Sequence, residues 1–88
     1  MANPEIVVCP AGQWTLVAED VTTGYIWPKK KDPNLYKQTY RDTGEDAPDN
    51  DDDAIPMPKD GIAISSTTSI DVYIKAVGKA GSVRVDIP

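Results

Sequence analysis

Period-two alternation of apolar and polar residues constrains the fold of this chain more than any other feature. Residues 69–77 place their apolar side chains on one face of an extended strand, namely Ile70, Val72, Ile74 and Ala76. Residues 82–87 alternate in the same way, and a glycine-containing turn at residues 78–81 separates the two runs. Because the turn is short and both runs alternate, we expect a C-terminal β-hairpin.

Five further short runs are rich in β-branched and aromatic residues and are bounded by Gly, Pro, Asp or Asn. They span residues 5–9, 13–18, 22–27, 35–41 and 61–65. No stretch repeats the i, i+3, i+4, i+7 spacing of an amphipathic helix. The sequence therefore predicts one all-β domain over residues 1–88, a small β-sandwich or β-barrel of about seven short antiparallel strands. Trp14 lies in one of these runs, and we expect it to pack in the core.

Residues 42–53 form an acidic segment that carries seven of the fourteen acidic residues of the chain. So many charges cannot enter a core, and the segment is expected to be an exposed loop. Asp49, Asp51 and Asp53 have the spacing of the first ligands of a calcium-binding loop, but Ala54 stands where such a loop needs glycine. These three carboxylates are a weak candidate metal site, and a solvated loop or one that faces a basic partner is the alternative.

Residue usage excludes several classes of function. The chain has 88 residues, one cysteine and no histidine, so neither an intrachain disulfide nor a zinc site with four Cys/His ligands is available. The absence of histidine also removes the commonest general base, and we expect no enzymatic activity and no cofactor. A domain this small has a marginal core, which favours reinforcement by oligomerisation or by docking onto a larger body.

Charge and hydropathy bear on partners and location. The formal net charge of −5 repels nucleic acid and anionic lipid, and no apolar run is long enough for a signal peptide or a membrane span. We therefore expect no nucleic-acid or membrane partner, and synthesis in a reducing cytoplasm.

Exposed aromatic and basic residues near the middle of the chain are the candidate interface. Tyr25 and Trp27 alternate in one predicted strand, and Lys29, Lys30 and Lys31 follow directly after Pro28. An exposed tryptophan beside a tyrosine is a typical interface anchor, and the lysines would suit an acidic segment of another chain. Stacking of a carbohydrate on the aromatic rings is the alternative reading.

The order of short segments resembles that of small virion proteins of tailed bacteriophages. The likeness is one of layout and covers most of the chain, in residues 13–18, 21–24, 36–44 with Ala47 and Pro48, 70–78 and 83–86. It implies a β-sandwich or β-barrel subunit that occupies many equivalent positions on a capsid or tail, as a capsid decoration (cement) protein or a head or tail accessory subunit.

The partners that this resemblance implies are copies of the chain itself and a larger virion protein such as the major capsid protein. The implied location is the virion, after synthesis in the cytoplasm of the bacterial host. A small module that binds carbohydrate or calcium is the alternative function.

Overall fold

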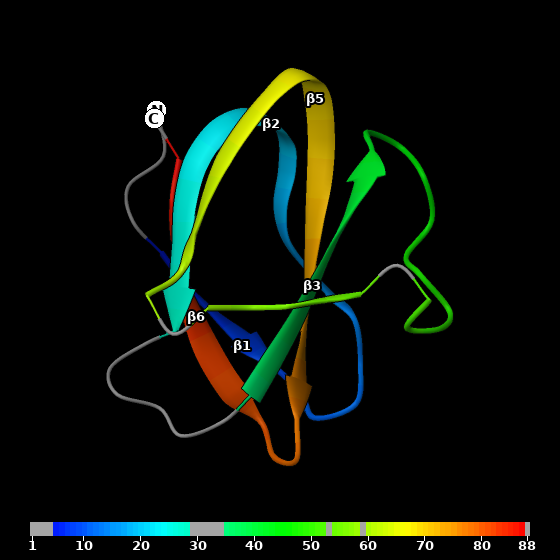
Figure 1. The fold of residues 1–88 in the computed structure, drawn as a ribbon, viewed down its shortest axis with the longest axis vertical. Coiled ribbons are helices and arrows are strands. Elements are labelled where there is room, and N and C mark those ends of the chain that lie inside the picture. Colours follow the sequence, from blue (N-terminus) through cyan, green and yellow to red (C-terminus); the bar gives the residue numbers. More distant parts are fainter. Residues whose placement is uncertain (1–4, 29–34, 53, 59, 88) are drawn as a thin grey trace.

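The structure is a computed structural model that describes residues 5–28, 35–52, 54–58 and 60–87. Within these residues it is all-β, as predicted, with six strands and no helix (Figure 1). The strands are β1 (Glu5–Cys9), β2 (Thr15–Pro28), β3 (Leu35–Asp42), β4 (Ile55–Pro56), β5 (Ile62–Val77) and β6 (Gly81–Asp86).

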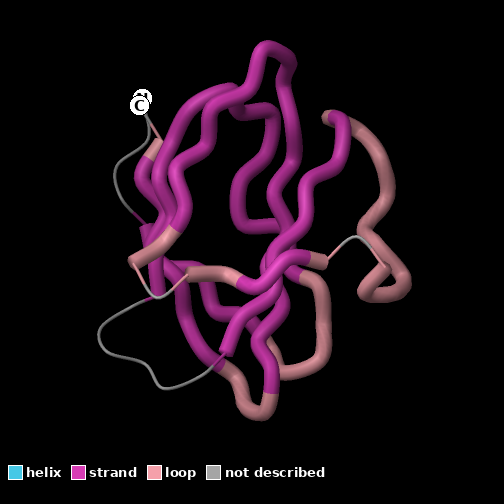
Figure 2. Tube along the Cα trace, viewed as in Figure 1, coloured by secondary structure: helices cyan, strands magenta, loops and turns pink. Residues whose placement is uncertain are grey.

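All strands belong to one antiparallel sheet in the order β1-β6-β2-β5-β3-β4. The two longest strands, β2 and β5, pair along most of their lengths and bend together, so that the sheet curls around a central core (Figure 2). A parallel bridge between Ala11 and Ala76 brings the segment after β1 back to β5. The result is a single curled sheet, closer to a barrel than to two stacked layers.

Two pairs of predicted strands are continuous in the structure, which reduces the expected seven to five, and the short strand β4, which was not predicted, makes six. Residues 13–18 and 22–27 join in β2 because register shifts between Leu16 and Thr23 absorb the extra residues, and Asp20 takes a left-handed φ of 56° at this bulge. Residues 61–65 and 69–77 join in β5 through a run of Ser and Thr, which are compatible with extended backbone.

The predicted C-terminal hairpin is wrong in its pairing. A turn at residues 78–80 does separate β5 from β6, and Gly78 takes a positive φ of 96° there. However, β6 lies between β1 and β2, and β5 pairs with β2 and β3. Alternation identifies the inward side chains of a strand but does not identify the strands that pair with it. Between β1 and β2, both edges of β6 are paired.

The core is built from alternate residues of five strands. Tyr36 adds a buried ring from β3. The least exposed side chains come from β1, β2, β5 and β6, and they are Cys9, Ile26, Val72, Ile74, Val83 and Val85. Ile26 is central because its register partners are Val85 on one side and Ile62 on the other. Burial of these aliphatic side chains is the main stabilising contribution available to so small a domain.

Asp71 is a buried carboxylate on β5, with 3% of its surface exposed. Its Oδ1 accepts a hydrogen bond from the backbone N–H of Asp20 at 3.0 Å, and its Oδ2 accepts one from the N–H of Gly44 at 3.3 Å. These bonds compensate part of the cost of removing the carboxylate from water. Asp71 thereby ties the bulge of β2 to the start of the acidic segment.

Ile26→Ala tests the position of the core. We expect a loss of about 2–5 kcal/mol in the free energy of unfolding, since the substitution removes a fully buried side chain between three strands. The matched control is Ile55→Ala on β4, where the isoleucine is 50% exposed and the loss should stay below about 1 kcal/mol. Urea denaturation of both variants measures the difference, and equal losses would contradict this core.

The alkylation rate of Cys9 tests whether the end of β1 is packed on the core. The Cys9 thiol is buried, and desolvation raises its pKa to about 11. Alkylation requires the thiolate, so we expect native protein at pH 8 to react with iodoacetamide at least tenfold more slowly than the chain in urea. Equal rates in both conditions would show that β1 is not packed on the core.

Candidate interaction surface

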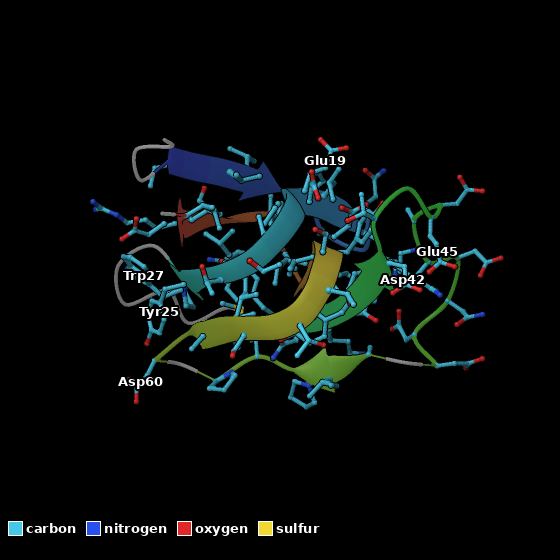
Figure 3. All side chains as sticks on the ribbon, turned by 90° about the horizontal axis from the view of Figure 1, so that it is seen from above. Glu19, Tyr25, Trp27, Asp42, Glu45 and Asp60 are labelled. Atoms are coloured by element: carbon cyan, nitrogen blue, oxygen red, sulfur yellow. The ribbon has the colours of Figure 1, made fainter. Side chains whose placement is uncertain are left out.

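Tyr25 and Trp27 lie on the outer face of β2, on either side of the buried Ile26. The structure brings their rings together, with centroids 5.0 Å apart and planes inclined by 47°. Tyr25 is 40% exposed, and Trp27 is half-buried. Two of the five predicted interface residues are therefore adjacent and accessible at one end of the molecule (Figure 3).

Residues 60 and 61, which precede β5, pack against the part of β2 that carries the two rings. The Tyr25 hydroxyl donates a hydrogen bond of 2.6 Å to the carbonyl oxygen of Asp60. Gly61 follows, with a φ of 91°, and a Cβ at this position would lie 2.5 Å from the carbonyl oxygen of Ile26 and 2.6 Å from the Cβ of Trp27. Only glycine permits this approach, so the start of β5 packs closely against the strand that carries the rings.

Arg84 of β6 completes the aromatic pair, and the sequence did not single it out. It is the register partner of Trp27, and its guanidinium carbon lies 5.6 Å from the Trp27 ring centroid. Such a cation–π contact orients the arginine without neutralising its charge. Alternation placed Arg84 on an outward face, but only the pairing of β6 with β2 shows that this face is the one that carries Trp27.

Two exposed aliphatic residues of β1 extend the same surface. Ile6 is the register partner of Arg84 and is 45% exposed, and Val8 is 64% exposed. We call Ile6, Val8, Tyr25, Trp27 and Arg84 the outer face. Lys29, Lys30 and Lys31, which the sequence also nominated, lie outside the described residues.

The acidic segment is attached to the sheet through Asp51. Lys37 of β3 and Lys75 of β5 are register partners, so two ammonium groups stand side by side. The Asp51 carboxylate accepts a hydrogen bond from each ammonium group, with Oδ2 at 2.9 Å from Lys37 Nζ and Oδ1 at 2.5 Å from Lys75 Nζ. Like charges at directly opposite positions destabilise a sheet, and this carboxylate relieves the repulsion.

Trp14 belongs to this attachment and not to the core, contrary to prediction. It is half-buried, its indole Nε1 donates to the carbonyl oxygen of Asn50 at 3.1 Å, and Lys75 Nζ lies 5.1 Å from its ring centroid. Trp14 precedes the first residue of β2, so strand alternation does not govern its direction. The Trp14 side chain packs between the acidic segment, at Asn50, and Lys75 of β5.

The candidate calcium site is disfavoured by the same contacts. Both carboxylate oxygens of Asp51 face lysine ammonium groups, which would repel a cation. Across the four described stretches of the chain, no three Asp, Glu, Cys or His side chains converge as a metal site requires. Asp49 is exposed, and Asp53 lies outside the described residues.

Three other acidic residues of the segment, Glu45, Asp46 and Asp49, line a shallow, open hollow together with Arg41, Gly44 and Ala47. Figure 3 shows Asp42 and Glu45 at the end of the molecule opposite Tyr25 and Trp27. The outer face and the acidic segment are therefore separated by the body of the sheet.

No protein-family model, no curated protein and no solved structure matches this chain. Among the described residues there is no helix with the length and apolar character needed to cross a membrane.

Asp51 gives a prediction about pH. Hydrogen bonds from Lys75 and then Lys37 hold the pKa of this carboxyl below its usual range. The stabilisation is therefore present above the unfolded-state pKa of about 3.9 and is lost as the pH falls through the lower folded-state value. We expect Trp14 emission to shift to the red over that acidic interval, measured in a Trp27→Phe background so that Trp14 is the sole tryptophan.

Asp51→Ala should produce the same red shift at pH 7, because the segment loses its attachment to both lysines. Asp52→Ala is the matched control, since Asp52 is exposed in the same segment and the carboxylate that binds Lys37 and Lys75 is that of Asp51. A red shift of equal size in both variants would contradict a specific role for Asp51.

Proposed function

We propose that this protein is a structural subunit of a tailed-bacteriophage virion, of the capsid decoration (cement) type, and that it acts through protein–protein contacts of its outer face. The observation that carries the binding role is the combination on this face of Tyr25, Trp27 and Arg84 with exposed Ile6 and Val8. Aromatic residues and arginine are the side chains enriched in the energetically dominant part of protein interfaces.

The arrangement of the outer face favours a protein partner. The bond from Tyr25 to the Asp60 carbonyl and the Arg84 contact with Trp27 order these side chains before binding. A partner therefore pays less conformational entropy than it would for mobile side chains. Exposed aliphatic residues on the adjoining strand β1 enlarge the apolar part of the surface.

Carbohydrate binding fits this surface less well. Stacking of a sugar needs accessible ring faces, and two neighbouring rings serve one chain of sugars best when they are nearly coplanar. Here the ring planes are inclined by 47°, and Arg84 lies over the Trp27 ring. A protein surface of mixed apolar and acidic character matches the rings and the guanidinium together.

The virion assignment rests on the layout of the segments in the sequence, and the distribution of charge agrees with it. When the outer face is bound to a particle, the acidic segment at the opposite end faces outward (Figure 3). Net charge on an exposed surface keeps particles dispersed in solution. The proposed partners are copies of this chain and a larger virion protein such as the major capsid protein, in particles made in the cytoplasm of a bacterial host.

Localisation on purified particles tests the virion assignment. Particles are isolated from the bacterial cells that express the chain and are labelled with an antibody and gold. We expect label at many equivalent positions on the head, with the chain co-purifying in a fixed ratio to the major capsid protein. Absence of the chain from the particle fraction would refute the assignment.

Trp27→Ala tests the outer face as the binding surface. Particles lacking the chain are incubated with purified variants, and bound protein is quantified as a function of concentration. We expect affinity at least tenfold lower than for the unmodified chain, in line with the loss at a central aromatic anchor. Thr67→Ala, an exposed position on β5 outside the outer face, is the control that should bind normally. Equal affinity for Trp27→Ala and the control would place the contact elsewhere.

A further inference from the structure

The strand β1 is at one end of the sheet. It pairs with β6 along Glu5–Cys9, and within the described part of the chain no strand pairs with its other edge. Only the segment that follows β1 bridges to β5, at Ala11. Backbone N–H and C=O groups along such an edge are available to another strand where the residues are exposed, as Ile6 and Val8 are, whereas Cys9 at the end of β1 is fully buried.

The two ends of the sheet are protected differently. At the far end, β4 has two residues, and one of them, Pro56, has no N–H to donate. By contrast, β1 is five residues long and has no charged residue between Ile6 and Cys9. Its two outward side chains are aliphatic and among the most exposed apolar groups of the described chain.

The sequence of β1 is complementary to itself. Antiparallel pairing of two copies centred on Val7 sets Val7 opposite Val7 and sets Ile6 of each copy opposite Val8 of the other. Both pairs of Ile6 and Val8 then lie on the outward side, where each shields the other from water. We propose that β1 of two copies pairs in this register across a two-fold axis, so that the partner of this edge is a second copy of the chain.

This pairing would join the outer faces of the two copies. Residues directly opposite one another in a sheet point to the same side, and Ile6 is in register with Arg84, which is in register with Trp27. Both outer faces therefore lie on one side of a continuous sheet that crosses the two-fold axis. The inference deepens the proposed function by naming one partner, but its test needs only the purified chain.

The contact is small, and this sets its strength. Five residues per strand bury far less than the roughly 1,200–2,000 Å² of a stable interface. Dimers should therefore form reversibly at high concentration. When copies are held side by side on a particle, the raised effective concentration favours the same contact.

Val8→Lys tests the contact by placing a charge next to the centre of the pairing, opposite Ile6 of the other copy. Sedimentation velocity of the unmodified chain should show a dimer fraction that rises with concentration, whereas Val8→Lys should remain monomeric at the same concentrations. Ile55→Lys is the control, because Ile55 is a comparably exposed apolar residue at the opposite end of the sheet. A monomeric unmodified chain up to millimolar concentration, or equal loss of dimer in both variants, would overturn the proposal.

Disulfide trapping tests the register. In a Cys9→Ala background, Ile6→Cys and Val8→Cys variants are oxidised separately and as a mixture. The register places Ile6 directly opposite Val8 of the other copy. The two Ile6 residues are diagonal neighbours, with Cα atoms about 7–8 Å apart, which is beyond the reach of a disulfide. We expect the mixed dimer to form at least tenfold faster than either homodimer. Faster homodimer formation or no preference would overturn this register, while particle binding by the Trp27→Ala variant reports on the proposed function separately.

Discussion

The fold depends on the buried carboxylate of Asp71. It lies on the longest strand, and its two oxygens bind the backbone of Asp20 in the bulge of β2 and of Gly44 at the start of the acidic segment. The bulge accommodates the bend of β2, which pairs with β5 through its first part and with both β5 and β6 through its last part. Without those two bonds, the buried carboxylate oxygens would lose their backbone donors and the bend would lose its support.

The bend of β2 separates two chemically different ends of the molecule. At one end, the last residues of β2 meet β6 and β1, and the outer face gathers aromatic, aliphatic and guanidinium groups. At the other end, Asp51 and Trp14 attach the acidic segment to β3 and β5. An apolar surface that can be covered and an acidic end that stays hydrated suit a subunit held on a larger body, which is the proposed role.

Reinforcement by neighbours also agrees with the size of the core. The least exposed side chains are few and mostly short aliphatic groups, and the only thiol is buried and cannot form an intrachain disulfide. Contacts at the edge of β1 and over the outer face would cover apolar groups that remain exposed in the isolated chain, and partner binding stabilises the folded state by mass action. The sheet end at β4 is instead shortened and closed by proline.

The sequence by itself determined the all-β class, the inward residues of β6 and the alternation of Tyr25 and Trp27, because side-chain direction in a strand follows from a period of two. Tertiary structure decided the rest. The place of β6 between β1 and β2, the contact of Arg84 with Trp27 and the capture of Asp51 by Lys37 and Lys75 all join residues far apart in the chain. Local alternation carries no information about which strands become neighbours, since that choice depends on how the whole sheet closes over one core.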